Sequence, residues 1–542
     1  MASTSPPLRP PAGSTRPAGA GLRAWQQRAL GAMEEWRSGS FLISAAPGAG
    51  KTRPALEFAR RELSRRACDA VVIACPTAPL TRQWARAAHG VGLDLVPDAE
   101  SPRPPAGFHG VVVTYARIAK AARQWAAAAG PRTLVVADEA HHLGEDLAWG
   151  DSFSSAFAQA SRWLLLSGTP FRSDATPIPG VSYDSDGLAE PDLAYSYADA
   201  VRDGICRPVA FVTYDGTLSW RSGDDVIESS FDTVLSTREA SRRYRTAIST
   251  ELPDGLPRIL READERLRGL RSAGHPDAAG LVIAADSAHA RRIAALLREA
   301  TGRVPVVVLH AEPRAAAKLT AFTHDRTPWI VAVNMVSEGV DIPRLRVGVY
   351  ATAAKTPLVF RQIVGRFVRT LPGRPPEPSW LYIPADPVLR AHAAGVEHEL
   401  RVVLRRRSED AMGEELERPE RRETEPGVGL DFEPLLADVA PQMTLFGPAP
   451  ASPPPSPLVE QPPPPPIPIP DARPLPAFER RNRLRNERHR LVSEVARRDG
   501  SSHREVNAWV NRSLGVTSVE KATLGQLEKA VELLTRRLSP RR

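Results

Sequence analysis

Two short motifs in the first third of the chain carry residue types suited to phosphate chemistry. The first is the segment 45–52, Ala-Ala-Pro-Gly-Ala-Gly-Lys-Thr, which follows a short apolar run. Gly48 and Gly50 allow backbone N–H groups to wrap a phosphate, Lys51 can bind the outer phosphate oxygens, and the hydroxyl of Thr52 can bind Mg²⁺. We predict a phosphate-binding loop for ATP and Mg²⁺, with a plain glycine-rich turn as the alternative.

The second motif is Asp138-Glu139-Ala140-His141, directly after the apolar run at 134–136. Adjacent carboxylates at the end of a strand can divide the work of hydrolysis. Asp138 would hold Mg²⁺ through water, and Glu139 would orient and activate the attacking water. The alternative is the solvated start of a helix.

Buried strands must position both motifs. β-rich runs alternate with helical patterns from residue 22 to about 160, and such spacing is typical of a parallel α/β sheet. These runs are residues 41–43, 71–74, 111–113, 134–136 and 163–166. A second α/β series starts near residue 208, with runs at 209–212, 281–284, 306–308, 330–333 and 347–350, and a charged helical segment at 235–270.

From about residue 20 to 400 the motifs stand in the order found in superfamily 2 helicases and translocases, and the chain resembles their DEAD/DEAH-box and restriction-type branch. The resemblance implies an α/β fold of two tandem RecA-like parallel-sheet domains, at 21–205 and 206–405. It also implies ATP hydrolysis with ATP and Mg²⁺ as ligands.

The resemblance assigns further roles in the first half. Gln26, in Leu-Arg-Ala-Trp-Gln at 22–26, matches the adenine-reading element. Ser167 and Thr169, in Ser-Gly-Thr-Pro, match the motif that couples hydrolysis to domain movement through His141. Motifs at 76–84 and 113–115 match the elements that contact a nucleic-acid strand, with the candidates Thr77, Arg82, Gln83, Thr114 and Tyr115.

In the second half, residues 334–343 resemble motif five, and Gly339 and Asp341 are expected to contribute to the nucleotide site. Residues 362–369 match motif six, with Gln362, Arg366 and Arg369 as catalytic candidates. The two arginines would neutralise charge that develops on ATP bound by the first domain. Taken alone, arginines three residues apart on a helix usually mark a solvated face.

The motif at 362–369 differs from that of the spliceosomal RNA helicases, and the form Glu-Gly-Val-Asp-Ile-Pro at 338–343 is closer to DNA excision-repair and restriction motors. We therefore expect an ATP-dependent DNA helicase or translocase that serves repair, recombination or phage defence in a bacterium. The alternatives are an RNA helicase and an ATP-gated DNA-binding scaffold that unwinds nothing.

Composition limits the remaining options. The chain has 542 residues and a net charge of +8, and residues 477–542 hold 16 Lys and Arg against 8 Asp and Glu. The excess of positive charge therefore belongs to the C-terminal part. Three cysteines cannot build a disulfide framework, and no stretch approaches 18 uncharged apolar residues. A cytoplasmic, nucleoid-associated protein without a membrane partner fits these facts.

The segments outside the motor are predicted from composition. We expect a disordered leader at 1–20 and, at 406–476, an acidic and then proline-rich disordered linker. Helical periodicity returns at 477–542, where Ser502…Glu505 and Thr523…Gln526 have capping-box spacing and six arginines between 480 and 490 could bind phosphate. This predicts a small, basic, all-α domain that binds nucleic acid or a partner.

A pentapeptide before the proline-rich segment adds one partner hypothesis. Gln442-Met443-Thr444-Leu445-Phe446 resembles the peptides that dock on the bacterial sliding clamp. Leu445 and Phe446 would fill an apolar pocket while Gln442 forms a hydrogen bond at its rim. The alternative is a hydrophobic latch that folds back onto the motor.

Overall fold

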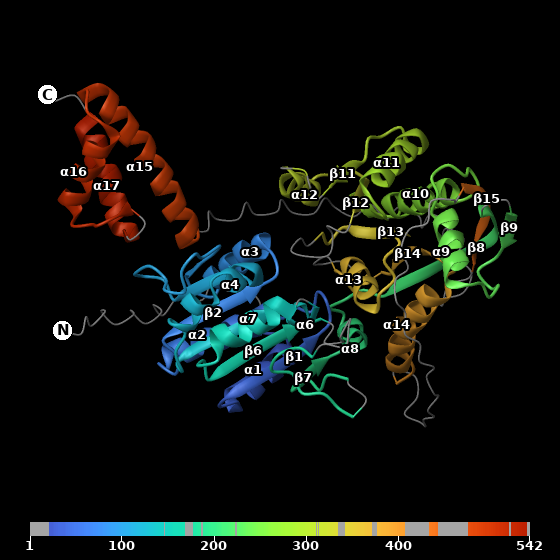
Figure 1. Cartoon of the computed structure of the whole chain (residues 1–542), viewed down its shortest axis with the longest axis horizontal. Coiled ribbons are helices and arrows are strands. Elements are labelled where there is room, and N and C mark those ends of the chain that lie inside the picture. Colours follow the sequence, from blue (N-terminus) through green and yellow to red (C-terminus); the bar gives the residue numbers. More distant parts are fainter. Residues whose placement is uncertain are drawn as a thin grey trace, which may run out of the picture. The chain divides into compact units, whose positions relative to one another are not determined.

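The structure is a computed structural model (Figure 1). It describes residues 21–145, 147–168, 177–185, 188–222, 225–309, 312, 314–333, 342–370, 377–406, 433–442, 475–519 and 522–538. The chain divides into two compact units. The first unit comprises residues 1–44, 50–194 and 461–542, and the second comprises 45–49 and 195–460.

The first unit is built on a seven-stranded sheet with the order β3-β4-β2-β5-β6-β1-β7. Neighbouring strands from β3 to β1 run parallel. The strands are β1 (Gly39–Ala45), β2 (Ala70–Cys75), β3 (Leu95–Val96), β4 (Gly110–Thr114), β5 (Thr133–Asp138), β6 (Arg162–Ser167) and β7 (Leu193–Tyr195). Parallel order brings the carboxyl ends of β1, β2, β4 and β5 to one edge, so the residues that follow them can form one site.

Helices connect these strands (Figure 1). They are α1 (Ala24–Glu35), α2 (Thr52–Ser64), α3 (Ala78–His89), α4 (Tyr115–Lys120), α5 (Ala122–Ala126), α6 (His142–Glu145) and α7 (Leu147–Phe157). Alternate residues of the strands form one core with α4, α5 and α7, in which Trp125, Phe153 and Phe157 are fully buried. Side chains alternate between the two faces of a strand. The burial of Val135 and Ala137 in this core therefore fixes the direction of the Asp138 side chain as well as its position.

The second unit contains an eight-stranded sheet with the order β11-β12-β10-β13-β14-β8-β15, and β9 pairs with β8. The strands are β8 (Val209–Ser222), β9 (Asp225–Ser229), β10 (Ala279–Ala284), β11 (Val306–Val308), β12 (Trp329–Val333), β13 (Leu345–Ala351), β14 (Ser379–Pro384) and β15 (Glu433–Gln442). Pairing is parallel from β11 to β8 and antiparallel for β9 and β15. Two mostly parallel sheets therefore confirm the predicted tandem RecA-like architecture.

The helices of the second unit are α8 (Tyr197–Arg202), α9 (Thr237–Ala247), α10 (Leu256–Ser272), α11 (Ser287–Thr301), α12 (Ala315–His324), α13 (Pro357–Phe367) and α14 (Pro387–Arg406). The charged segment expected at 235–270 forms two helices, α9 and α10. Gly255 precedes α10, and a Cβ there would lie 2.9 Å from Cβ of Ala437. The break therefore falls where the chain needs a residue without a side chain.

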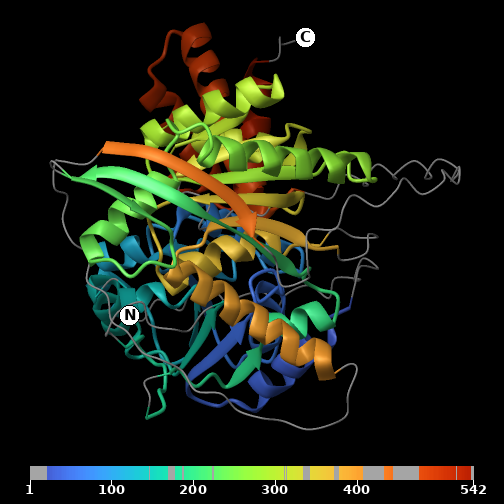
Figure 2. The same cartoon turned by 90° about the vertical axis from the view of Figure 1, so that its right-hand side faces the viewer.

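Strand β15 corrects the prediction of a disordered linker at 406–476 for residues 433–442 alone. Residues 433–442 pair antiparallel with β8 and extend the sheet, as Figure 2 shows for two long neighbouring strands. Ala437 and Val439 are buried on it. A Cβ on Gly216 would lie 1.8 Å from the carbonyl oxygen of Asp438, so β8 needs glycine where β15 crosses. Composition pointed to disorder, but alternate apolar residues in this short run are enough to pair with an existing sheet.

The C-terminal part forms the three tail helices α15 (Ala477–Asp499), α16 (His503–Leu514) and α17 (Leu524–Leu538). The capping box at Ser502 forms, with a hydrogen bond of 3.2 Å from the backbone N–H of Glu505 to Ser502 Oγ. Leu491, Val495, Val510 and Leu534 share the core of these helices. The predicted helical tail is therefore confirmed as a small bundle.

Two general features complete the description. All three cysteines, Cys68, Cys75 and Cys206, are buried thiols. Within the described ranges, no helix combines the length and the apolar character that crossing a bilayer would require.

Candidate functional site

The phosphate-binding loop joins β1 to the start of α2. Gly48 and Gly50 have φ angles of +86° and +89°, in the left-handed region that side chains disfavour. Lys51 directly precedes α2, with its side chain 9% exposed, and Thr52 is the first helical residue. The loop thus places backbone N–H groups and a cation at a helix N-terminus, which is a favourable anion site.

Gln26 holds this loop from the neighbouring helix α1. Its Nε2 donates a 3.0 Å hydrogen bond to the carbonyl oxygen of Gly50, and its Oε1 accepts one of 3.0 Å from the backbone N–H of Arg23. A Cβ on Gly50 would lie 3.0 Å from Gln26 Nε2. The structure therefore places the predicted adenine-reading residue in contact with the phosphate loop itself.

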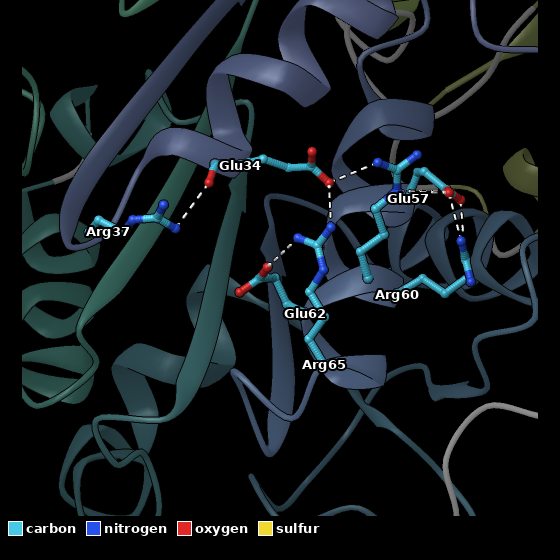
Figure 3. A network of polar contacts seen from close by, with 7 residues as sticks. Glu34, Arg37, Glu57, Arg60, Glu62 and Arg65 are labelled. Atoms are coloured by element: carbon cyan, nitrogen blue, oxygen red, sulfur yellow. Dashed lines mark hydrogen bonds and ion pairs between the residues drawn. The ribbon is translucent and has the colours of Figure 1, made fainter.

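Ion pairs fasten the other end of α1 to α2 (Figure 3). The carboxylate of Glu34 accepts from Arg61 at 2.7 Å and from Arg65 at 3.2 Å. Hydrogen bonding to Arg61 keeps the pKa of Glu34 below its ordinary value. Since Gln26 binds Gly50 at the near end, α1 is attached to the loop and its helix at two points.

The same network reaches the sheet through α2. Glu57 accepts two hydrogen bonds from Arg60, at 2.7 and 3.1 Å, and Figure 3 shows this paired contact. Glu62 is buried and pairs with Arg162 of β6 at 2.7 Å. Breaking a buried pair of this kind typically costs about 3–5 kcal/mol, whereas the exposed pairs contribute far less. The pair of Glu62 with Arg162 is therefore the main electrostatic anchor of α2.

Asp138 is the last residue of β5, and Glu139 follows in a strained backbone conformation. Glu139 has φ +50°, which costs a residue with a side chain on the order of 1 kcal/mol. Two hydrogen bonds hold the turn. Tyr115 Oη donates to the carbonyl oxygen of Asp138 at 2.7 Å, and the N–H of Ala140 donates to the carbonyl oxygen of Leu166 at 2.9 Å. The strain aims Glu139 at the phosphate loop.

Lys51 and the two carboxylates form the electrostatic centre of the site. Lys51 Nζ lies 3.4 Å from Glu139 Oε1. Burial, reinforced by the charge of Glu139, raises the pKa of Asp138 to about 6. Burial alone would raise the pKa of Glu139 too, but the charge of Lys51, followed by those of His141 and His142, lowers it to about 2. The neighbouring carboxylates therefore have well-separated proton affinities.

The coupling residues are only partly described. His141 Nδ1 lies 3.1 Å from Ser167 Oγ, and both residues are buried. His141 Nδ1 also lies 3.6 Å from Glu139 Oε2, so one imidazole bridges the carboxylate turn and the end of β6. Thr169 lies outside the described residues.

The nucleic-acid candidates lie in different environments. Thr77 and Thr114 precede α3 and α4, and Gln83 is exposed on α3. The hydroxyl of Thr77 is buried and makes no hydrogen bond within the described part of the chain. Arg82 donates to Asp98 at 3.0 Å. These residues are near the edge where a strand is expected to bind, but Arg82 is already paired.

Tyr115 corrects the prediction of a nucleic-acid contact. It is 1% exposed and packs beside Trp149 and Phe153. A side chain this buried cannot reach a nucleic-acid strand, and its hydroxyl is committed to the carbonyl oxygen of Asp138. The aromatic ring of Tyr115 belongs to the core, and its hydroxyl supports the turn at Asp138 and Glu139.

Two residues that support the site, Trp84 and Asp98, were not predicted from the sequence. Trp84 Nε1 donates a 2.7 Å hydrogen bond to Asp138 Oδ2 from the buried side of α3. Asp98 has φ +52° and binds Thr81 Oγ1 at 2.8 Å in addition to Arg82. Trp84 is the last residue of the motif at 76–84 and could have been proposed, whereas nothing around Asp98 in the sequence signals its role.

The second unit carries the other motifs. Gln362 and Arg366 lie on α13, and Arg369 follows that helix; all three side chains are partly exposed. Gly339 and Asp341 lie outside the described residues. The catalytic roles of these residues stay predictions.

The clamp-peptide hypothesis also stays a prediction. Gln442 is the last residue of β15, paired with Thr213, and Leu445 and Phe446 lie outside the described residues.

Comparison with known families supports the same architecture. The family model described as type III restriction enzyme, res subunit, matches residues 20–172, and the helicase conserved C-terminal domain matches residues 266–370. Helicase domains of this kind imply nucleotide binding and ATP hydrolysis.

Bacterial relatives match most of the chain. An uncharacterized protein of Mycobacterium tuberculosis is 44% identical over 393 residues, and one of Mycobacterium leprae is 42% identical over the same length. Each match covers 71% of this chain, which in turn spans 65% of the length of these curated relatives.

Solved structures with similarity include restriction enzymes. The ATP-dependent type ISP restriction-modification enzyme LlaBIII bound to DNA is 16% identical, with a TM-score of 0.45, covering 71% of this chain and 30% of that one. A fragment of an HsdR subunit of a type I restriction enzyme from Vibrio vulnificus is 16% identical, with a TM-score of 0.47, covering 70% and 67%.

Both helicase models match in chain order over the two sheets, and the matching relatives are bacterial. These matches support the resemblance to the superfamily 2 helicases of bacteria.

Proposed function

We propose that the protein is a DEAH-box ATPase that moves along or unwinds DNA. The observation that carries the ATPase part is the approach of Lys51 Nζ to Glu139 Oε1, 3.4 Å, beside the buried carboxylate of Asp138. A lysine from a phosphate loop and two carboxylates at a strand end are the groups that nucleotide hydrolysis needs.

The residues present fit ATP and Mg²⁺. The left-handed glycines give the loop the curvature that wraps a phosphate, and a side chain at Gly50 would meet Gln26. Thr52 and Asp138 would hold the ion, which would supply positive charge for the phosphates. Gln26 binds the carbonyl oxygen of Gly50, so recognition of adenine by Gln26 would be linked directly to the phosphate loop.

The pKa values suggest how the lysine controls the base. While Lys51 faces Glu139, it keeps the pKa of that carboxylate near 2, which makes it a weak proton acceptor. A phosphate that draws Lys51 away would remove this attraction and let the pKa of Glu139 rise. Glu139 would then orient the attacking water only when substrate occupies the loop.

Hydrolysis is proposed to reach the rest of the motor along two routes. The contact between His141 and Ser167 would transmit changes at Glu139 toward Thr169. Arg366 and Arg369, with Gln362, are proposed to complete the nucleotide site, as the resemblance to motif six implies. Guanidinium groups suit this role because they stay charged and can bind phosphate through two donors.

DNA is the proposed track. The matched family model is named for a restriction-enzyme subunit, and the sequence at 338–343 resembles DNA motors. We propose a role in repair, recombination or phage defence. RNA as the track, and an ATP-gated DNA-binding scaffold, are the alternatives.

An ATPase panel tests the proposal. Turnover of the full chain would be measured with single-stranded DNA, duplex DNA, forked DNA and RNA, each with Glu139→Gln as the matched inactive control. We expect DNA to stimulate turnover and RNA not to. Stimulation by RNA alone would support the RNA helicase, and DNA binding with neither stimulation nor strand displacement would support the scaffold.

A further inference from the structure

A cavity of about 700 Å³ opens within the first unit between the loop at 97–108 and the beginning of α15. Its walls come from segments that are far apart in the sequence. The polar and aromatic lining includes Arg103 and Phe108 from the loop, and Phe478, Arg481, Asn482 and Arg485 from the helix. Cavities of roughly 300–1,000 Å³ are typical of small-molecule and cofactor sites, so this one exceeds what a lone inorganic ion would fill.

Several contacts hold α15 at this loop. The helix packs against β3, and Glu479 pairs with Arg86 of α3 at 2.7 Å. Phe478 is 7% exposed, and the guanidinium carbon of Arg481 lies 5.8 Å from the ring centroid of Phe108. The first turns of the tail are therefore a wall of the first unit and not a free arm.

Positive charge is concentrated in the cavity. Burial, together with the charge of Arg485 one turn away, lowers the pKa of Arg481 to about 10. Within the described residues, the Nε of Arg485 is buried without a hydrogen-bond acceptor. Arg103, from the loop, also lines the cavity and is exposed. Clustered guanidinium groups of this kind favour an anion in the space between them.

The acidic residues on the wall do not cancel this charge. Asp98 is bound by Thr81 and Arg82, and Glu100 is exposed to solvent. Other arginines of α15 serve the bundle itself: Arg488 is buried and donates to Asn507 and Asn511, and Arg480 pairs with Glu528. The six arginines at 480–490 are therefore not one phosphate-binding strip, as the sequence suggested; two of them line this cavity.

The loop is tied to the helices that follow the strand-contacting motifs. The carboxylate of Asp98 binds Thr81 and Arg82 of α3, and its carbonyl oxygen accepts a 2.6 Å hydrogen bond from Arg117 of α4. These helices begin directly after Thr77 and Thr114. A strand that contacts both threonines would thus run close to the loop.

We propose that this cavity binds one segment of single-stranded nucleic acid that continues from the strand-contacting motifs. Arg103 and Arg485 bind backbone phosphates, and the buried rings of Phe478 and Phe108 form part of the apolar wall behind them. Cationic grooves with aromatic side chains are the usual means of binding single strands without sequence preference. The inference rests on the proposed function, because it extends the path of the nucleic acid onto the tail.

The test is a salt titration of binding with the full chain. Affinity for a fluorescein-labelled 20-nucleotide dT strand and a 20-nucleotide U strand is measured by anisotropy at several salt concentrations for Arg103→Ala and Arg485→Ala. Arg483→Ala is the matched control, because Arg483 is exposed on the same helix and does not line the cavity. Melting curves show whether each variant folds.

We expect each cavity variant to bind about 3- to 10-fold more weakly and to lose about 0.7 from the slope of log affinity against log salt per phosphate contact. Arg483→Ala should bind like the unmodified chain. Arg485 also donates to the carbonyl oxygen of Val519, so Arg485→Ala can lower the melting temperature. In that case the conclusion is drawn from Arg103→Ala alone. The two labelled strands show whether DNA, RNA or both enter the cavity.

Two results would overturn the inference: cavity variants that bind like Arg483→Ala, or weaker binding with an unchanged salt slope, which would mean that the arginines only position the tail. Failure of the proposed function looks different. In that case the unmodified chain itself would bind neither strand, or would bind without any effect on ATP turnover.

Discussion

Trp84 and Asp138 are joined by a hydrogen bond of 2.7 Å from the indole Nε1 to Oδ2, and both side chains are buried. Trp84 lies on α3, which begins after Thr77, while Asp138 is the last residue of β5, directly before the turn at Glu139. One bond therefore connects the helix of a strand-contacting motif to the carboxylate expected to hold Mg²⁺. A nucleic-acid strand that displaces α3 would therefore change the hydrogen bond to the Asp138 carboxylate.

Trp84→Phe tests that connection. Removing the N–H takes away a donor that lowers the pKa of Asp138, so the pKa should rise further above its ordinary value. The acid limb of the pH profile of kcat/KM for ATP should shift to higher pH, and stimulation by nucleic acid should fall. Trp125→Phe is the control, because the buried indole Nε1 of Trp125 has no hydrogen-bond partner within the described part of the chain. An acid limb that stays in place would show that the indole has no influence on the carboxylate.

Lys51→Ala and Glu139→Gln should both abolish turnover, but for different reasons. Loss of Lys51 removes a phosphate ligand, so nucleotide affinity should fall. Glu139→Gln keeps the size of the side chain and the phosphate loop, so the variant should bind ATP and stay trapped on nucleic acid. Binding of a fluorescent nucleotide and single-turnover hydrolysis distinguish the two. Near-normal hydrolysis by Glu139→Gln would disprove its role as the base.

Asp138→Asn should change how stability depends on pH in the absence of nucleotide and Mg²⁺. The pKa of Asp138 is about 6 in the folded chain, above the ordinary 3.8. The free energy of unfolding therefore falls as pH rises through that interval, because this carboxyl ionises first in the unfolded chain. From pH 5 to pH 7, the free energy of unfolding of the variant, measured in urea, should rise by about 1 kcal/mol relative to that of the unmodified chain. A difference that does not vary with pH would mean that Asp138 ionises normally.

Arg366→Ala and Arg369→Ala should lower kcat by about 10³–10⁵ with a modest loss of ATP affinity, as expected for groups that act on transition-state charge. Pre-steady-state hydrolysis and equilibrium nucleotide binding would be compared for each variant. Equal losses in binding and hydrolysis would show that these arginines contact the ground state, and the proposed role would fail.

A peptide covering residues 438–450 should bind the purified bacterial sliding clamp with a Kd on the micromolar scale if the pentapeptide docks there. Leu445→Ala with Phe446→Ala is the control. Because Gln442 of β15 pairs with Thr213 of β8, the full chain should bind the clamp more weakly than the free peptide does. Binding that is absent, or unchanged by the double substitution, would remove the clamp from consideration.

The sequence predicted the sheets well because their strands are buried on both faces and read as continuous apolar runs. The runs at 71–74, 134–136 and 281–284 all lie within strands. Strand β3, with two residues, and β7, with three, are too short to leave a pattern. Strand β15 was not predicted, because the acidic and proline-rich composition of its flanking segments indicated disorder. The alternating apolar residues Ala437 and Val439 were too short a pattern to indicate a strand.

The phosphate loop and the carboxylate pair were predictable because their chemistry restricts residue type at fixed spacing. The nucleic-acid candidates were less secure, since a threonine or tyrosine after a strand serves many purposes. Tyr115 turned inward because its ring fills the core beside Phe153. The contacts of Asp98 and Trp84 depend on tertiary neighbours that no local pattern encodes.

Pairing of β15 with β8 has a practical consequence for truncation. A chain that stops after α14, at Arg406, would contain every helicase motif but would leave residues 213–221 of β8 with open backbone donors and acceptors. Such an edge invites pairing with another molecule, and Gly216 offers no side chain to obstruct it. Self-association of a minimal motor fragment would therefore reflect a missing strand, and extending the fragment through Gln442 should keep it monodisperse.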